Sequence, residues 1–289
     1  MSQDFKQDRS YKEFLPNTEE ELILSDHEAE SLANELRTQM KEGVGPIANR
    51  EFINKLIAGL GEKRGLLRRT FSKTLGNIGV KAIPALTKVL HNHSNVTVRR
   101  AAAKTLRLIK NPITLPHLYK ALTSDIDPVV QGSCVAAMAI FGEESVELLL
   151  EVFNDPQSTA IQCGLASWGI SFIGSRAPEA ILKASRSESN QIRAAAIAAL
   201  TDQIHVHGDN TARNIVLHAL KDPSEDVRSE ATILIGRLNE QEWSQPLLIN
   251  QLNDICKEVR KNAAFALIKI NATNSISSLE NKIKEEKDQ

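Results

Sequence analysis

The chain has 289 residues, of which 42% are hydrophobic and 25% are charged, and its formal net charge is −1. This length and composition allow a large hydrophobic core, in one or two compact domains or in one elongated array. Aromatic residues make up only 4% of the chain, which argues against a β-sandwich and favours helices that pack through small side chains.

The N-terminus shows no targeting signal. It reads MSQDFKQDRSYKEF, a polar stretch with Asp4 and Asp8, and therefore lacks both a secretory apolar segment and the acid-poor character of a transit peptide. No apolar run reaches the roughly 18 residues that a membrane span needs. Three widely spaced cysteines, Cys134, Cys163 and Cys256, indicate a reducing compartment. We expect a soluble, cytoplasmic protein.

Three segments differ in composition. Residues 1–26 are polar and irregular, and we expect them to be disordered. The stretch HEAESLANELRTQMKEG predicts one amphipathic helix that ends at Gly43. We therefore expect residues 27–49 to form a capping helix and a linker, followed by a helical array over residues 50–285.

The array is predicted from one helical phrase that returns seven times. The copies begin at Leu67, Val98, Val130, Gln162, Ile192, Val227 and Val259. Their second residues are spaced by 31, 32, 32, 30, 35 and 32 positions: Arg68, Arg99, Gln131, Cys163, Arg193, Arg228 and Arg260. A second helix is predicted between successive phrases, often with a proline in its first turn, as in AIPALTKVL and SQPLLINQL. This pattern predicts an all-α chain, an α solenoid (superhelix) of about seven helix pairs.

Polar residues recur at the loops of the array. An aspartate stands six residues before the arginine in the pairs Asp222 with Arg228 and Asp254 with Arg260, and Asp125 stands in the same relation to Gln131. We expect such pairs to form a polar ladder through the array.

The phrases DPSEDVRSEA and VRRAAAKTL, in helix pairs of 30 to 32 residues, resemble the HEAT-like repeats of the E/F-type phycobilin lyase family and its relatives. The resemblance covers about residues 50–285, and SWGISFIG with GEKRGLLRRTFSKTLGNIG is similar to a cyanobacterial branch of that family. HEAT-like arrays serve many roles, so the repeat is far more specific for the fold than for the function.

A candidate binding surface follows from the helical period. Counted from the arginine, positions one, four, five and eight of each phrase share one stripe, which we expect to face the concave groove. In the first two repeats this stripe is basic: Arg69, Lys73, Arg100, Lys104 and Arg107. In the next three it is small and apolar, and it includes Val135, Ala139, Trp168, Ile197 and Ala198.

Trp168 lies in STAIQCGLASWGISFIG, a stretch of seventeen residues without a charge. We interpret this stretch as the central inner helix of the array and expect Trp168 on the floor of the groove. The alternative is that Trp168 packs into a neighbouring repeat as a core residue.

Charge is segregated along the chain. Residues 61–110 contain 12 Lys and Arg against the single acid Glu62, whereas residues 111–160 contain one basic and seven acidic residues. The basic block predicts a site for an anionic group, and the alternative is a solvated surface with ladder arginines.

Signals of catalysis or metal binding are weak. We expect His91, His93, His205 and His207 in loops, without the spacing of metal ligands, and we predict no metal site. Cys134 and Cys163 are interpreted as packing residues, whereas Cys256 beside Lys257 could be more reactive. No catalytic residue is assigned.

The resemblance implies a protein that binds a bilin, a phycobiliprotein subunit or both, for the attachment, isomerisation or removal of the chromophore. It implies no permanently bound cofactor, a linear tetrapyrrole (bilin) as ligand, and a phycobiliprotein subunit or a second HEAT-like lyase subunit as partner. Arg69, Lys73, Arg100, Lys104, Arg107 and Trp168 would form the binding groove, with bilin rings on the indole. The alternative is a non-enzymatic scaffold or adaptor for an acidic protein, in phycobilisome disassembly or cofactor assembly. Nucleic-acid binding ranks last, because the pI is near 6.7 and aromatic residues are not interleaved with the basic ones.

Overall fold

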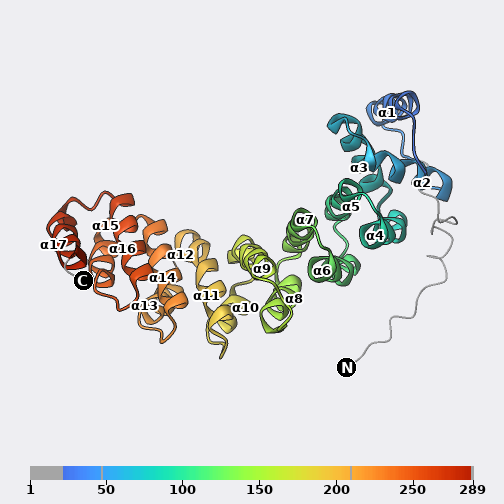
Figure 1. Cartoon of the computed structure of the whole chain (residues 1–289). Helices are drawn as coiled ribbons and strands as arrows, with labels where there is room; N and C mark the ends of the chain where they lie inside the picture. The colour runs from blue at the N-terminus through green and yellow to red at the C-terminus, as the bar shows by residue number, and fades with distance from the viewer. Residues whose placement is uncertain (1–21, 47, 209, 288–289) are drawn as a thin grey trace. The chain divides into compact units, whose positions relative to one another are not determined.

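The structure, a computed structural model, describes residues 22–46, 48–208 and 210–287 (Figure 1). Regular structure in these ranges is helical, and no strand occurs among them. The prediction of an all-α chain is therefore confirmed.

Each of the seven repeated phrases lies on a helix. These phrase helices are α3 (Gly65–Ile78), α5 (Val96–Ile109), α7 (Pro128–Met138), α9 (Ala160–Ile173), α11 (Asn190–Ala199), α14 (Glu225–Leu238) and α16 (Lys257–Lys269). A partner helix precedes each one: α2 (Arg50–Ala58), α4 (Ile83–Asn92), α6 (Leu115–Ser124), α8 (Glu143–Asn154), α10 (Pro178–Ala184), α13 (Asn210–Ala219) and α15 (Gln241–Gln251). The helix α17 (Ile276–Lys287) follows the last pair. The predicted solenoid of helix pairs is confirmed.

Short 3₁₀ turns join several of these helices. They are η2 (Gly59–Gly61), η3 (Gly79–Ala82), η4 (Pro112–Thr114), η5 (Ala139–Phe141), η6 (Gly174–Arg176) and η7 (Thr273–Ser275).

The chain divides into two compact units, and each has its own stack of phrase helices. The first unit extends to Phe141 and includes residues 159–165, and the second consists of residues 142–158 and the chain from Ala166 onward. In the first unit α3, α5 and α7 pack in sequence order, with α4 and α6 beside them. In the second unit α11, α14 and α16 pack in the same manner.

The helix α1 (Asp26–Lys41) packs against α3 in the first unit. It begins with a capping box, in which the Glu28 N–H donates to Ser25 Oγ at 3.3 Å and the Ser25 N–H donates to Glu28 Oε2 at 2.8 Å. Its last helical residue is Lys41, and Gly43, the residue predicted to end it, follows the C-cap with a φ of +71°, while the Val44 N–H donates to the Gln39 carbonyl at 2.9 Å. The disorder predicted for residues 1–26 concerns mainly residues outside the described ranges.

Helix boundaries correct four local predictions. His91 lies in α4, and His205 and His207 lie in α12 (Thr201–His207), so these three histidines are helical and not in loops. The break between α11 and α12 at Leu200 accompanies the longest repeat spacing. Pro246 was expected in a first helical turn, but it lies inside α15, which already begins at Gln241.

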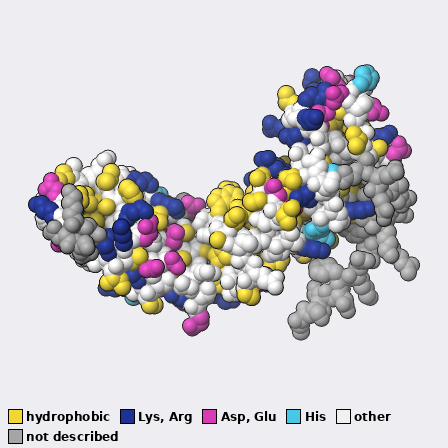
Figure 2. Space-filling model, in the orientation of Figure 1, with side chains coloured by type: hydrophobic (Ala, Val, Ile, Leu, Met, Phe, Trp, Pro, Cys, Tyr) yellow, Lys and Arg dark blue, Asp and Glu magenta, His cyan; other side chains and the backbone are white. Residues whose placement is uncertain are grey.

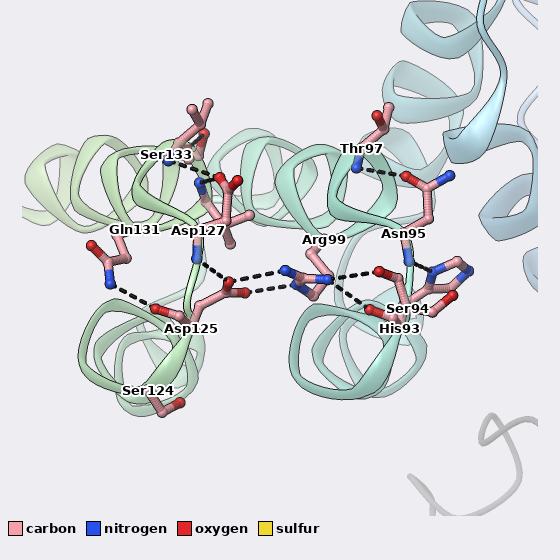
Figure 3. A network of polar contacts seen from close by, with 12 residues as sticks. His93, Ser94, Asn95, Thr97, Arg99, Ser124, Asp125, Asp127, Gln131 and Ser133 are labelled. Atoms are coloured by element: carbon pink, nitrogen blue, oxygen red, sulfur yellow. Dashed lines mark hydrogen bonds and ion pairs between the residues drawn. The ribbon is translucent and has the colours of Figure 1, made fainter.

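The polar ladder is present, but its pairing differs from the prediction (Figure 3). Arg99 binds Asp125 of the next repeat through two bonds, Nε to Oδ2 at 2.7 Å and Nη2 to Oδ1 at 3.0 Å. Arg193 and Arg228 bind the next aspartates in the same way: Asp222 and Asp254. The aspartate therefore pairs with the arginine of the preceding repeat and not with the arginine six residues later.

The residue six positions later binds the aspartate's backbone instead. Gln131 Nε2 donates to the Asp125 carbonyl at 2.6 Å, and Arg260 Nη1 donates to the Asp254 carbonyl at 2.9 Å. Gln131 and Cys163 replace the arginine in the third and fourth phrases, so neither offers a guanidinium to a following repeat. This interruption coincides with the division between the two units.

Candidate functional site

Five exposed cations form what we call the basic face of the first unit. The helices α3 and α5 contact each other, and their side chains at equivalent repeat positions point to solvent. Figure 2 shows Lys and Arg side chains gathered over the part of the molecule where Figure 1 places these helices. All five residues predicted from the sequence are exposed: Arg69, Lys73, Arg100, Lys104 and Arg107.

The basic face is not neutralised by acids of the described chain. No carboxylate of these ranges forms an ion pair with any of its five cations, whereas nearby Arg64 contacts Glu62 at 2.9 Å and Glu30 at 3.4 Å. The Arg64 bonds lower the pKa of Glu62 to about 2. Partial burial, then the positive charges of Arg100 and Arg68, lower the pKa of Lys104. Such uncompensated repulsion is relieved by an anionic ligand or partner.

A cleft of about 710 Å³ opens beside Lys73 in the same unit. Its walls are the end of α1, the loop after it, the end of α3 and one residue of α5. The lining residues are Leu36, Gln39, Met40, Gly43, Val44, Gly45, Pro46, Lys73, Thr74, Gly76, Asn77 and Leu108. Most of this lining is apolar or glycine, and Lys73 is its cation.

Close approach of α3 and α5 shapes the floor of the cleft. A Cβ atom built on Gly76 would lie 3.0 Å from the Leu108 Cβ, so the glycine allows the two helices to meet here. Leu108 and Val44 remain 50% and 53% exposed. Half-exposed apolar side chains around one cleft favour an occupant with apolar surface.

Trp168 lies on a second surface, which belongs to the second unit. The indole is 47% exposed and stacks on Phe172, with ring centroids 5.7 Å apart and ring planes inclined by 27°. The Arg176 guanidinium lies 5.2 Å from the Phe172 ring centre and donates to the Phe172 carbonyl at 2.8 Å. We call these three residues the aromatic platform. The alternative interpretation of Trp168 as a core residue is wrong.

Four other residues of the predicted apolar stripe do not face solvent. They are Val135, Ala139, Ile197 and Ala198, which are all buried in the helix packing. The five predicted cations lie together in the first unit, whereas Trp168 lies in the second unit. The aromatic platform is therefore described by itself.

Two of the three cysteines, Cys134 and Cys163, are poor candidates for a nucleophile, and the prediction for Cys256 stays a prediction. Burial raises the pKa of the Cys134 thiol, and partial burial raises that of Cys163, which disfavours the reactive thiolate. Within the described ranges, no group of three or more His, Cys, Asp or Glu is arranged to hold a metal ion. None of the helices described there combines the length and apolar character needed to cross a membrane.

The cleft and two members of the aromatic platform, Phe172 and Arg176, were not predicted from the sequence. Phe172 follows Trp168 by four residues, the spacing at which side chains of a helix meet, so this partner could have been found. The cleft depends on how a loop with Gly43 and Gly45 returns past α3, and no periodic pattern encodes such a path.

Comparison with known families gives a HEAT repeats match over residues 53–139, 177–267 and 213–289. The bilin biosynthesis protein MpeU of Synechococcus sp. (strain WH8020) is 43% identical over 266 residues, which cover 92% of this chain and 90% of the relative. The uncharacterized phycocyanin operon protein Z of Pseudanabaena tenuis (strain PCC 7409) is 33% identical over 139 residues, which cover 46% of this chain and 69% of the relative.

Solved structures with helical similarity are more distant. E. coli YibA is 16% identical with a TM-score of 0.41, and the alignment covers 92% of this chain and 93% of YibA. The complex of CpcE and CpcF of phycocyanin lyase from Nostoc sp. PCC7120 is 20% identical with a TM-score of 0.32, covering 63% of this chain and 96% of the matched chain. At these identities and TM-scores, the solved structures support no inference about the function of this chain.

Proposed function

Because this chain belongs to the HEAT-repeat family and is similar over most of its length to a bilin biosynthesis protein, we propose that it handles a bilin for a phycobiliprotein. It binds the bilin, the phycobiliprotein subunit or both, and it takes part in attachment, isomerisation or removal of the chromophore. The observation that carries this proposal is 43% identity over 92% of the chain.

The basic face suits the anionic part of such a substrate. A bilin carries two propionates and a conjugated ring system, and carboxylates form their strongest hydrogen bonds with cationic donors. Arg69, Lys73, Arg100, Lys104 and Arg107 offer these donors without competing acids among the described residues. The same face suits the acidic surface of a protein partner.

Positioning is the mechanism that these residues support. In attachment, the acceptor's cysteine thiol adds across a C=C bond at one end of the bilin. The S–C bond forms, the π bond breaks and the thiol proton moves to the bilin carbon, so no oxidant or reductant is consumed. Holding the two reactants in line lowers the barrier by up to about 7–11 kcal/mol in ideal cases.

The proposal is tested by incubating the purified chain with free bilin and the apo form of a phycobiliprotein subunit. Denaturing electrophoresis then shows whether the bilin has become covalently bound and whether the chain accelerates this step. Reactions with a second HEAT-like subunit, and reactions that start from the loaded subunit, test partner dependence and removal. No change in the amount or type of attached bilin in any of these reactions would contradict the proposal.

The uncompensated basic face also favours a second function, a scaffold or adaptor for an acidic protein. In that case the chain binds a phycobiliprotein subunit in a salt-sensitive manner and leaves the chromophore content unchanged. Co-purification without chromophore chemistry would select this function.

A further inference from the structure

We propose that the cleft between α1 and α3 is the bilin seat of this chain, with Lys73 pairing a propionate and apolar side chains covering the rings. This inference rests on the proposed function and names the surface that would carry it. It differs from the sequence-based expectation that the rings stack on Trp168.

The size of the cleft fits a small organic ligand. Its volume of about 710 Å³ falls within the roughly 300–1,000 Å³ typical of ligand pockets. The cleft ends at a loop and a helix terminus, so it does not form the long groove that a partner helix needs.

The chemistry of the lining fits an apolar body with an acidic group. Met40, Val44, Pro46 and Leu108 present apolar surface, and two of them are half-exposed. A ligand that covers Val44 and Leu108 removes this surface from water and gains from its burial. Asn77 and Gln39 add hydrogen-bonding groups that can meet pyrrole N–H or lactam groups.

Charge places the acidic end of the ligand. Lys73 lines the cleft, and Arg69 lies four residues earlier on the same face of α3. The equivalent positions of α5 hold Arg100 and Lys104. A ligand carboxylate at Lys73 therefore lies at the edge of the basic face, where positive potential is focused.

Contacts between α1 and α3 hold the two helical walls of the cleft before a ligand arrives. Arg37 of α1 donates to Thr70 Oγ1 of α3 at 3.4 Å, and Leu36 is buried between these helices. Arg64 binds the Asp26 carbonyl at 3.0 Å, which fixes the other end of α1. A site built on fixed helices loses less entropy when it binds.

The test measures the affinity of the full chain for free phycocyanobilin by absorbance and fluorescence titration. Asn77→Trp fills the cleft and is expected to raise the Kd tenfold or more. Val44→Glu places a like charge beside the propionates, with a similar effect. Lys73→Gln removes the proposed ion pair with a propionate, and because such a pair is exposed to solvent the Kd should rise about two- to fivefold. Asn92→Trp and Lys120→Gln are matched exposed controls on α4 and α6, and their Kd should equal that of the wild type.

The outcomes separate this inference from the proposed function. If the wild type binds the bilin and all three cleft variants bind equally well, the cleft is overturned while the proposed function stands. A loss confined to Trp168→Ala would move the rings to the aromatic platform and likewise overturn the cleft. If the folded wild type does not bind and attaches no bilin, both proposals fall. Circular dichroism confirms folding, and Val44→Glu decides the result if Asn77→Trp is unfolded.

Discussion

The ladder residues show how a single side chain links two repeats. Arg228 and Asp254 have side chains only 10% and 8% exposed, and the arginine bonds to one repeat's loop and the next repeat's carboxylate. Replacing one partner of such a buried ion pair lowers the free energy of unfolding by about 3–5 kcal/mol, because the other charge is left buried and unpaired.

The same pair gives a pH-dependent prediction. Burial opposes ionisation of Asp254, but the bonds from Arg228 and from the Cys256 N–H outweigh it, so the pKa is lowered. A carboxylate of this kind stabilises the fold above its unfolded pKa of about 3.9 and loses that contribution as the pH falls through its lower folded value. Asp254→Asn should therefore destabilise the protein at pH 7, by a margin that shrinks below about pH 4.

Urea unfolding at several pH values measures this margin. The control is Asp226→Asn, which alters an exposed carboxylate on α14, and it should change the free energy of unfolding by less than about 0.5 kcal/mol. A margin for Asp254→Asn that is independent of pH would contradict the role assigned to the ladder.

Trp168 carries a prediction about partner binding. Exposed tryptophan near arginine is typical of binding hot spots, and here the indole stacks on Phe172, whose carbonyl accepts a hydrogen bond from Arg176. Trp168→Ala should weaken binding of the phycobiliprotein subunit at least tenfold in a calorimetric titration. Phe265→Ala is the matched control, because Phe265 is 60% exposed at the equivalent position of α16. Equal losses in both variants, or none in either, would remove the platform from the interface.

At the scale of the helix, replacement of two glycines in phrase helices by alanine should change the melting temperature in opposite directions. A Cβ on Gly236 would lie 2.6 Å from the Ala266 Cβ, whereas a Cβ on Gly164 meets nothing within 4 Å. Alanine gains up to about 1 kcal/mol of helix propensity, but overpacking costs about 1–3 kcal/mol. Gly236→Ala should therefore lower the melting temperature, and Gly164→Ala should raise it slightly. The reverse order would show that α14 and α16 do not pack as closely as described.

The helices were predictable because they repeat. The period of about 32 residues placed all seven phrase helices, and the exposed cations of α3 and α5 followed from the same period. The ladder pairing was not predictable, since sequence spacing relates Asp254 to Arg260 while the fold turns its carboxylate toward Arg228. The cleft could not be predicted, because it depends on the path of a non-periodic loop. The burial of four residues of the apolar stripe could not be predicted either, because the sequence does not state how closely neighbouring helices pack.

At the scale of the molecule, charge segregation makes the first unit a distinct electrostatic surface. Reversing Arg69, Lys73, Arg100 and Lys104 to Glu should weaken binding of the phycobiliprotein subunit and leave the helical circular dichroism signal unchanged, because all four side chains are exposed. Wild-type binding should also weaken with added salt. Reversal of four exposed lysines in the second unit is the control: Lys183, Lys221, Lys257 and Lys269. Binding that ignores both salt and the first reversal would exclude the basic face.

The central claim is that this HEAT-repeat chain handles a bilin, and a titration of the folded wild-type protein with free phycocyanobilin tests it most directly. Bilin absorbance and emission are followed, with heat-unfolded protein as the control. We predict saturable binding with one bilin per chain and a rise in bilin emission, because a held tetrapyrrole loses its internal motion. A folded protein that leaves both signals unchanged at every concentration, and that attaches no bilin when the apo subunit is added, would contradict the claim and favour the scaffold function.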